Sequence, residues 1–150
     1  MELSIIFLPL IAAIISGFFG KYIGDRNSEI VTSALVSISA LLSIFVLYQV
    51  IVNQYEENIV IATWINSGSL DVNWSMLIDP LSAVMLVVVT SVSSLVHIYS
   101  IGYMSHDPHK PRFMAYLSLF TFAMLMLVTS DNFFQLFFGW EGVGLCSYFL

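Results

Sequence analysis

PLSAVMLVVVTSVSSLVHIYSIGYM, residues 80–104, contains no aspartate, glutamate, lysine or arginine. A helix of this length rises about 37 Å at 1.5 Å per residue, which exceeds the roughly 30 Å hydrocarbon core of a bilayer. The whole chain has the same character, because 59% of its 150 residues are hydrophobic and only 9% are charged. Soluble domains carry about a quarter charged residues, so we predict a membrane protein that is solvated by lipid.

Four other apolar segments approach or exceed the roughly 20 residues that a membrane-spanning helix needs. An aspartate that precedes the first turn of a helix is preferably its N-cap, so we assign this role to Asp79, before Pro80, and to Asp131, before Asn132. The pattern predicts an all-α, multi-pass membrane protein with five transmembrane helices, at residues 3–20, 30–54, 80–104, 112–130 and 132–150.

The four basic residues of the chain predict its orientation. Lys21 and Arg26 lie between the first and second segments, and Lys110 and Arg112 lie between the third and fourth. Lysine and arginine in short loops are held on the cytoplasmic side of a membrane. We therefore expect the N-terminus outside, the first and third loops inside, and a fifth helix that runs from outside to inside.

The only long loop lies between the second and third helices. Its residues 70–76, LDVNWSM, alternate apolar and polar with period two, which is the pattern of a half-buried strand. They follow the β-branched and aromatic run NIVIATWI, residues 58–65, and the turn-forming residues NSGS, 66–69. We predict a small β-hairpin over about residues 59–77 on the outer surface and assign it no chemistry.

Charge and cysteine content exclude several classes of function. Four basic residues face ten acidic ones and form no patch that could neutralise phosphates, so we expect no nucleic-acid partner. Cys146 is the only cysteine, which excludes a disulfide framework and a multi-thiolate metal site. His106 and His109 lie in a loop without convergent acids, so we expect no metal site there.

Glu141 is the acid that stands out, within GWEGVG, residues 139–144. It lies nine residues after Asn132, about 13 Å into the fifth helix and close to the membrane midplane. An ionised acid at that depth costs about 2.5 to 3.5 kcal/mol on insertion scales, so it should face protein or water and have a partner or a proton. Such a carboxyl suits a proton relay. The alternative is a protonated acid that only hydrogen-bonds between helices.

Small residues beside Glu141 indicate how the fifth helix packs. Gly139, Gly142 and Cys146 fall on a face adjacent to the acid, where they allow close helix contact in lipid. Gly144 lies on the same face as Glu141 and leaves space beside the carboxyl. We therefore expect one tightly packed face and an open site next to it.

His97 is the second candidate for proton transfer. It lies about seven residues before the end of the third helix, near the inner side, where it could exchange protons with the cytoplasmic side. An interfacial histidine that only hydrogen-bonds to a neighbour is an equally open interpretation.

Three stretches together resemble the N-terminal part of a known family. They are DPLSAVMLVVVTSVSSLVHIYSIGYM (79–104), RFMAYLSLFTFAMLMLVTSDNFFQLFFGWEGVGLCSYFL (112–150) and, less specifically, the hairpin WINSGSLDVNWSMLID (64–79). They resemble the antiporter-like subunit of proton-pumping NADH:quinone oxidoreductase, respiratory complex I, called subunit L in bacteria and chain 5 in mitochondria. GWEGVGLCSYFL is the most specific stretch.

The resemblance implies a membrane-arm subunit that contributes to proton translocation coupled to quinone reduction, with no redox chemistry and no cofactor in this chain. Flavin and iron–sulfur clusters would belong to partner subunits of the complex. The family's proton-pathway glutamate corresponds to Glu141, its partner lysine lies on a later helix, and a role for His97 is possible. Residues 1–150 would be the N-terminal fragment of a larger domain, in the bacterial plasma membrane or the mitochondrial inner membrane.

Two alternatives remain open at this point. The large subunit of a cation/proton antiporter shares the fold and the glutamate, and copurification of a flavin- and iron–sulfur-containing arm would separate it from the first interpretation. A structural membrane scaffold for complex assembly is the alternative from another class.

Overall fold

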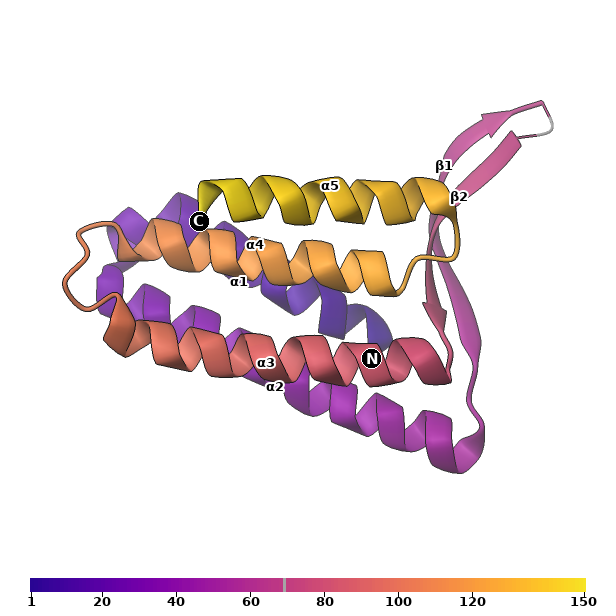
Figure 1. Ribbon diagram of the computed structural model, residues 1–150, viewed down its shortest axis with the longest axis horizontal. Coiled ribbons are helices and arrows are strands. Elements are labelled where there is room, and N and C mark those ends of the chain that lie inside the picture. The colour runs from indigo at the N-terminus through magenta and orange to yellow at the C-terminus, as the bar shows by residue number, and fades with distance from the viewer. Residues whose placement is uncertain (69) are drawn as a thin grey trace.

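In the residues that the structure describes there are five helices and one β-hairpin, as the sequence predicts (Figure 1). The structure is a computed structural model that describes residues 1–68 and 70–150. The elements are α1 (Glu2–Ile23), α2 (Asp25–Asn53), β1 (Glu57–Ser67), β2 (Leu70–Ile78), α3 (Pro80–Tyr103), α4 (Lys110–Val128) and α5 (Phe133–Phe149).

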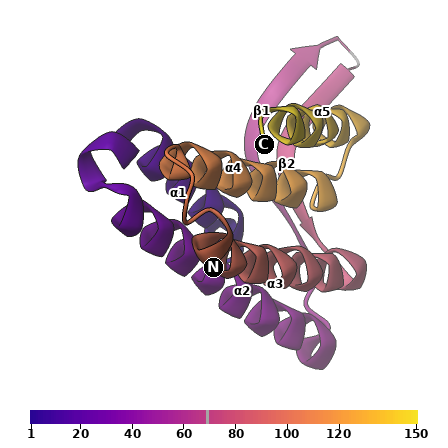
Figure 2. The same cartoon turned by 60° about the vertical axis from the view of Figure 1, so that its left-hand side comes forward.

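The helices form a bundle in which α4 lies between α3 and α5 (Figures 1 and 2). Helix α1 packs on both α2 and α4, α2 packs on α3, and α5 packs on α4. In the described part of the chain, α1 to α4 are long and apolar enough to cross a membrane. Helix α5 has 17 residues, about 25 Å at 1.5 Å per residue, so its existence is confirmed while its crossing of the bilayer stays a prediction.

The α1–α2 and α3–α4 connections lie at one end of the bundle, and the hairpin lies at the other (Figure 1). We call the first end the basic end, because the lysines and arginines lie there, although in helix ends and not in the loops we expected: Lys21 near the end of α1, Arg26 near the start of α2, and Lys110 and Arg112 at the start of α4. This grouping is what the predicted orientation requires. Which side of a membrane the basic end faces stays a prediction.

Helix α2 begins five residues earlier than predicted, at Asp25 instead of residue 30. Gly24 makes the short connection possible, since its φ of +86° lies in the left-handed region that favours glycine. Our boundary was wrong because we ended each apolar segment at its first charged residue, whereas the first turn of a helix at the end of a bundle accommodates charges. The correction brings Glu29 into α2, where it is buried.

The predicted hairpin is confirmed, with strands slightly longer than expected. β1 and β2 pair antiparallel, with Ser67 opposite Leu70, and Gly68 follows β1 with a φ of +62°. Ser69, the last residue of the predicted turn, lies outside the described residues. Val72, Met76 and Ile78 of β2 are buried, in line with the predicted alternation, but Trp74 is only half-buried and Ser75 is buried as well. Met76 and Ile78 join a core of ten residues at this end: Ile5, Ile6, Val46, Val50, Met76, Ile78, Ala83, Leu86, Leu125 and Met126.

One of the two predicted caps is confirmed and the other is wrong. Asp79 Oδ1 accepts hydrogen bonds from the backbone N–H and the hydroxyl of Ser82, both at 2.6 Å. At α5 the cap is Asn132, whose Oδ1 accepts from the backbone N–H of Gln135 at 2.9 Å. Asp131 lies one residue outside the helix and accepts from Asn58 of the hairpin at 3.1 Å instead. An asparagine caps as well as an aspartate, so sequence preference could not choose between the neighbours.

Replacing Asp79 with alanine should destabilise the full-length protein by about 1 kcal/mol, the usual cost of a lost N-cap. The two hydrogen bonds from Ser82 lower the pKa of the Asp79 carboxyl. A lowered pKa in the folded state means that the contribution is complete above the ordinary pKa of an aspartate and is lost as the pH falls through the lowered value. Melting temperatures of the two proteins in detergent should therefore differ at neutral pH and converge in acid. An equal difference at both pH values would contradict this role.

Candidate functional site

Glu141 lies on the side of α5 that the described residues leave uncovered. Its side chain is exposed, and within residues 1–68 and 70–150 it has neither a hydrogen bond nor an ion pair. Its neighbours on this surface are large and apolar: Trp140 is 66% exposed and Tyr148 is 83% exposed. A carboxyl thus stands in the middle of an apolar surface that other helices or lipid must cover.

Close contact with α4 fixes this orientation of α5. A Cβ atom added to Gly139 would lie 2.8 Å from the Cβ of Leu127 and 2.9 Å from its backbone nitrogen. A Cβ at Gly142 would lie 3.1 Å from the Cβ of Ala123, and Cys146 is buried. The predicted packing face is therefore confirmed. Since Gly139 and Glu141 are about 200° apart around a helix, packing through the glycine turns the carboxyl away from α4.

Gly144 provides the open space predicted beside Glu141. Within the described residues, a Cβ added to Gly144 would have no atom within 4 Å apart from its own helix backbone and neighbours. Gly144 lies about 60° from Glu141 around the helix axis and one turn further along. A long side chain from another helix could thus approach the carboxyl here without meeting a side chain on α5.

His97 lies in the contact between α3 and α4 and is fully buried. Its Nδ1 is 2.8 Å from the carbonyl oxygen of Ser93, and its Nε2 is 3.0 Å from the hydroxyl of Ser118. A carbonyl only accepts, so we assign the proton of the neutral ring to Nδ1 and let Nε2 accept from Ser118. If the ring gains a second proton, Nε2–H can donate to the same hydroxyl after that hydroxyl rotates. The pair can therefore accommodate both protonation states.

Buried and half-buried hydroxyls form further hydrogen bonds among three helices. Ser93 bonds to Thr121 of α4, Ser94 of α3 lies 2.8 Å from Ser37 of α2, and Thr90 lies 2.8 Å from Ser43. Ser93 also lies 3.3 Å from Nδ1 of His97, so the Ser93–Thr121 pair adjoins the histidine, whereas the other two pairs share no hydrogen bond with it. We did not predict this network. The spacing of Thr90, Ser93, His97 and Ser100, three or four residues apart on one helix face, was the sequence signal for it.

Glu29 and Lys110 form a second group that we did not predict. The Nζ of Lys110 lies 3.7 Å from Oε1 of Glu29, and both side chains are largely buried at the basic end. The sequence signal was weak, because Glu29 stands among charged residues next to a presumed loop. The pair lies between α2 and α4, so only the fold brings the two residues together.

The structure does not bring Glu141 and His97 together. His97 faces α4 from α3, and Glu141 lies on the side of α5 that points away from α4, as the contacts described above require. The two candidates therefore belong to separate places in this part of the protein. In the described residues no three histidine, cysteine, aspartate or glutamate side chains converge as a metal site would need. His106 and His109 are exposed near the basic end.

The fold and these sites define a class: a helical, multi-pass membrane protein with ionisable side chains inside its helices. Residues 64–114 match the family model described as NADH-Ubiquinone oxidoreductase (complex I), chain 5 N-terminus. Over 150 residues the chain is 56% identical to NADH-ubiquinone oxidoreductase chain 5 of Arabidopsis thaliana and 55% identical to that of Triticum aestivum. The resemblance to this family is confirmed.

The similarity covers only part of these relatives. The whole chain aligns with the proteins from Arabidopsis thaliana and Triticum aestivum, but it spans 22% of each of them. The chain 5 of Phytophthora infestans is 54% identical over 148 residues, again 22% of its own length. Most of each relative thus has no counterpart in these 150 residues.

Proposed function

We propose that this chain is the N-terminal part of an antiporter-like membrane subunit of NADH:quinone oxidoreductase and contributes to proton translocation coupled to quinone reduction. Similarity to chain 5 along the whole of the sequence supports this assignment. The observation that carries it is Glu141, an acid within an apolar helix whose carboxyl is turned away from α4. The chain itself performs no redox chemistry in this proposal, and flavin and iron–sulfur clusters belong to partner subunits.

Burial of Glu141 in the longer protein follows from energetics. A carboxylate that faced lipid would cost about 2.5 to 3.5 kcal/mol, so the exposed side of α5 is better covered by protein. Because the chain spans 22% of its relatives, the longer protein has ample further sequence to cover it. The family resemblance places a lysine on one of those later helices. A lysine that reaches Glu141 over Gly144 would form a pair in which one proton can be exchanged.

The remaining expectations fit this proposal. Residues 1–150 form the N-terminal part of a larger domain, with five membrane-spanning helices, the N-terminus outside and the basic end inside. The protein lies in the mitochondrial inner membrane or the bacterial plasma membrane, among other membrane subunits and lipid. His97 is a second proton-transfer group, which Ser118 can serve in either protonation state.

Replacing Glu141 with glutamine in the full-length protein tests the proposed function. The variant keeps the shape of the side chain and removes its proton exchange, so proton transfer through this site should fall by about 10²-fold or more. The measurement is the number of protons translocated per NADH oxidised by the intact complex in sealed vesicles. The matched control is Glu56→Gln, at an exposed carboxylate near the hairpin. Unchanged translocation and unchanged quinone reduction in Glu141→Gln would contradict the proposal.

Purification of the full-length protein separates the proposed function from a cation/proton antiporter. A respiratory subunit should copurify with flavin and iron–sulfur clusters, which are visible in absorption and electron paramagnetic resonance spectra. An assembly without these groups that exchanges cations for protons would support the antiporter instead.

A further inference from the structure

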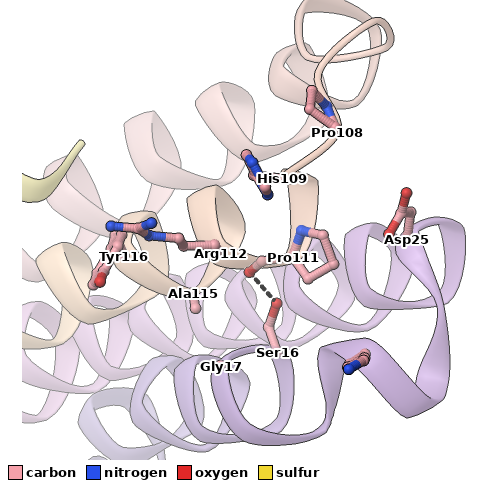
Figure 3. Close-up of a pocket in the computed structure, with 10 residues that line it drawn as sticks. Ser16, Gly17, Asp25, Pro108, His109, Pro111, Arg112, Ala115 and Tyr116 are labelled. Atoms are coloured by element: carbon pink, nitrogen blue, oxygen red, sulfur yellow. Dashed lines mark hydrogen bonds between the residues drawn. The ribbon is translucent and has the colours of Figure 1, made fainter.

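A cavity at the basic end has no role in the proposed function. It lies between the end of α1, the start of α2 and the start of α4, and its volume is about 500 Å³ (Figure 3). Small-molecule sites in proteins usually have about 300 to 1,000 Å³. The cavity is therefore large enough to take the polar headgroup of a lipid.

Two positively charged side chains line this cavity. Lys21 comes from the last turn of α1 and Arg112 from the first turn of α4, and both are exposed. Within residues 1–68 and 70–150 neither of them forms an ion pair. His109 also lines the cavity, and among the described residues the lining includes one acid, Asp25. The sequence shows no basic patch because these residues lie on separate helices, and only the fold brings them to one cavity.

The guanidinium of Arg112 is held in place by an aromatic ring. It lies over the ring of Tyr116, 5.6 Å from the centroid, and Figure 3 shows the two side chains together at one wall of the cavity. Tyr116 in turn stacks on Phe149 of α5, with ring centroids 5.3 Å apart. A guanidinium offers a planar fork of N–H groups that matches two oxygens of a phosphate. Arg112 is thus prepared to bind a phosphate group without first being ordered.

The charges at the start of α4 call for an anion. The first turn of α4 contains Lys110 and Arg112 and no acid, although the N-terminal end of a helix is the positive end of its dipole. Lys110 is compensated by Glu29, 3.7 Å away, whereas Arg112 has no such partner in the described part of the chain. An anion in the cavity would offset both the charge of Arg112 and the dipole of α4.

Hydrogen bonds between three helices fix the wall of the cavity. The hydroxyl of Ser16, on α1, donates to the carbonyl oxygen of Pro111 on α4 at 2.7 Å. Its only proton is then used, so the bonded hydroxyl of Ser28 on α2 is the donor to Ser16. A Cβ added to Gly17 would lie 3.5 Å from the Cβ of Ala115, so α1 and α4 also touch here. The cavity is therefore part of the packed bundle.

The cavity lies at the depth where a bilayer has its phosphate groups. Lys21 directly follows the apolar residues 3–20 of α1, and Arg112 directly precedes the apolar residues of α4. Basic pockets between membrane helices at this depth are typical sites for anionic lipid headgroups. Next to Gly17 on α1, the side chain of Phe18 is 77% exposed and offers an apolar surface for acyl chains. Charge and apolar surface thus occur together, as an anionic phospholipid requires.

We propose that this cavity binds the phosphate group of an anionic phospholipid. Arg112 donates to the phosphate oxygens through its guanidinium, Lys21 adds a second positive charge, and the acyl chains lie along the exposed side of α1. Inorganic phosphate shares the charge and the oxygens but has no part that uses the apolar surface. The inference does not depend on proton translocation, so the two can fail separately.

Photolabelling of the full-length protein in its intact membrane complex tests this site. The complex is placed in phosphatidylcholine vesicles with a small fraction of a probe lipid that carries a diazirine on its acyl chain close to the glycerol. The probe is either phosphatidylglycerol, which is anionic, or phosphatidylcholine, and labelled residues are mapped by peptide mass spectrometry. We expect the anionic probe to label residues 16–25 and 108–116 at least about fivefold more strongly, the contribution of one cation beside an anionic headgroup. Equal labelling by the two probes would overturn the inference.

Substitutions of the cations separate a defined site from general surface charge. Lys21→Gln with Arg112→Gln should weaken labelling of these residues by the anionic probe by about 30-fold, because two such cations are removed. The matched control is Arg26→Gln, an exposed cation at the same end that does not line the cavity, and it should leave labelling unchanged. Unchanged labelling in the double variant, or an equal loss in Arg26→Gln, would overturn the inference.

Competition on the unsubstituted protein identifies the source of the phosphate and needs no variant that folds. Excess unlabelled phosphatidylglycerol should suppress the labelling, and inorganic phosphate at the same concentration should not. Suppression by inorganic phosphate would overturn the assignment of a lipid to this cavity. Failure of unlabelled phosphatidylglycerol to compete would overturn it as well.

Discussion

Gly139→Ala should destabilise the full-length protein by about 1 to 3 kcal/mol, because the new methyl group has no room against α4. The added carbon would lie 2.8 Å from the Cβ of Leu127 and 2.9 Å from the Cα and backbone nitrogen of the same residue. Backbone atoms cannot move aside as a flexible side chain can. Helix α5 would have to shift, and Glu141 with it. The melting temperature of the purified protein in detergent measures the effect.

Gly144→Ala is the matched control for this prediction. It adds the same methyl group to the same helix, at a position where the described residues place nothing within 4 Å. We expect a much smaller change, since alanine is also a better helix former than glycine by up to about 1 kcal/mol. Equal melting temperatures for Gly139→Ala and the unsubstituted protein would contradict the contact between α4 and α5. That contact determines which way Glu141 faces.

Gln135→Leu should destabilise the protein by about 2 to 5 kcal/mol, because two buried backbone groups lose their partners. The fully buried Gln135 accepts from the backbone N–H of Ser75 at 3.0 Å and donates to its carbonyl oxygen at 2.7 Å. It thereby pairs with β2 much as a neighbouring strand would. Loss of this pairing separates the hairpin from α5, and protease digestion of the hairpin in intact membranes should become faster.

Asn58→Ala is the control for Gln135→Leu, because it also removes a hydrogen bond of the hairpin, but an exposed one. Asn58 donates to Asp131 at 3.1 Å in an exposed position. Exposed substitutions of this kind usually change stability by less than about 0.5 kcal/mol. Equal protease sensitivity in Gln135→Leu and in the unsubstituted protein would show that Gln135 does not hold the hairpin.

Local patterns predicted the elements of the fold well. Long charge-free stretches predicted the helices. Alternation in residues 70–76 predicted β2, because a period of two reports which face of a strand is buried. The predicted start of α2 was wrong because we took a charged residue as the boundary of the helix. At the basic end, Lys110 lies beside Glu29 and allows this acid to be buried. That partner comes from α4, and no local pattern reveals it.

The candidate site was predictable to a different extent. The glycines around Glu141 indicated both the packing face and the open space, since these follow from residue size and helix geometry. The environment of His97 did not follow from the sequence, because Ser118 and Thr121 belong to another helix and serine and threonine are common in helices of membrane proteins. Hydroxyl networks depend on the rotation of one helix against another, which single-sequence patterns do not fix.

We expect Glu141 to exchange a proton while the complex turns over. Infrared difference spectroscopy of the full-length complex, recorded between the resting state and steady turnover with NADH, measures this directly through the carboxyl C=O band. We expect a band change in the unsubstituted complex and in Glu56→Gln that is missing in Glu141→Gln. The same band change in all three proteins would contradict proton exchange at Glu141.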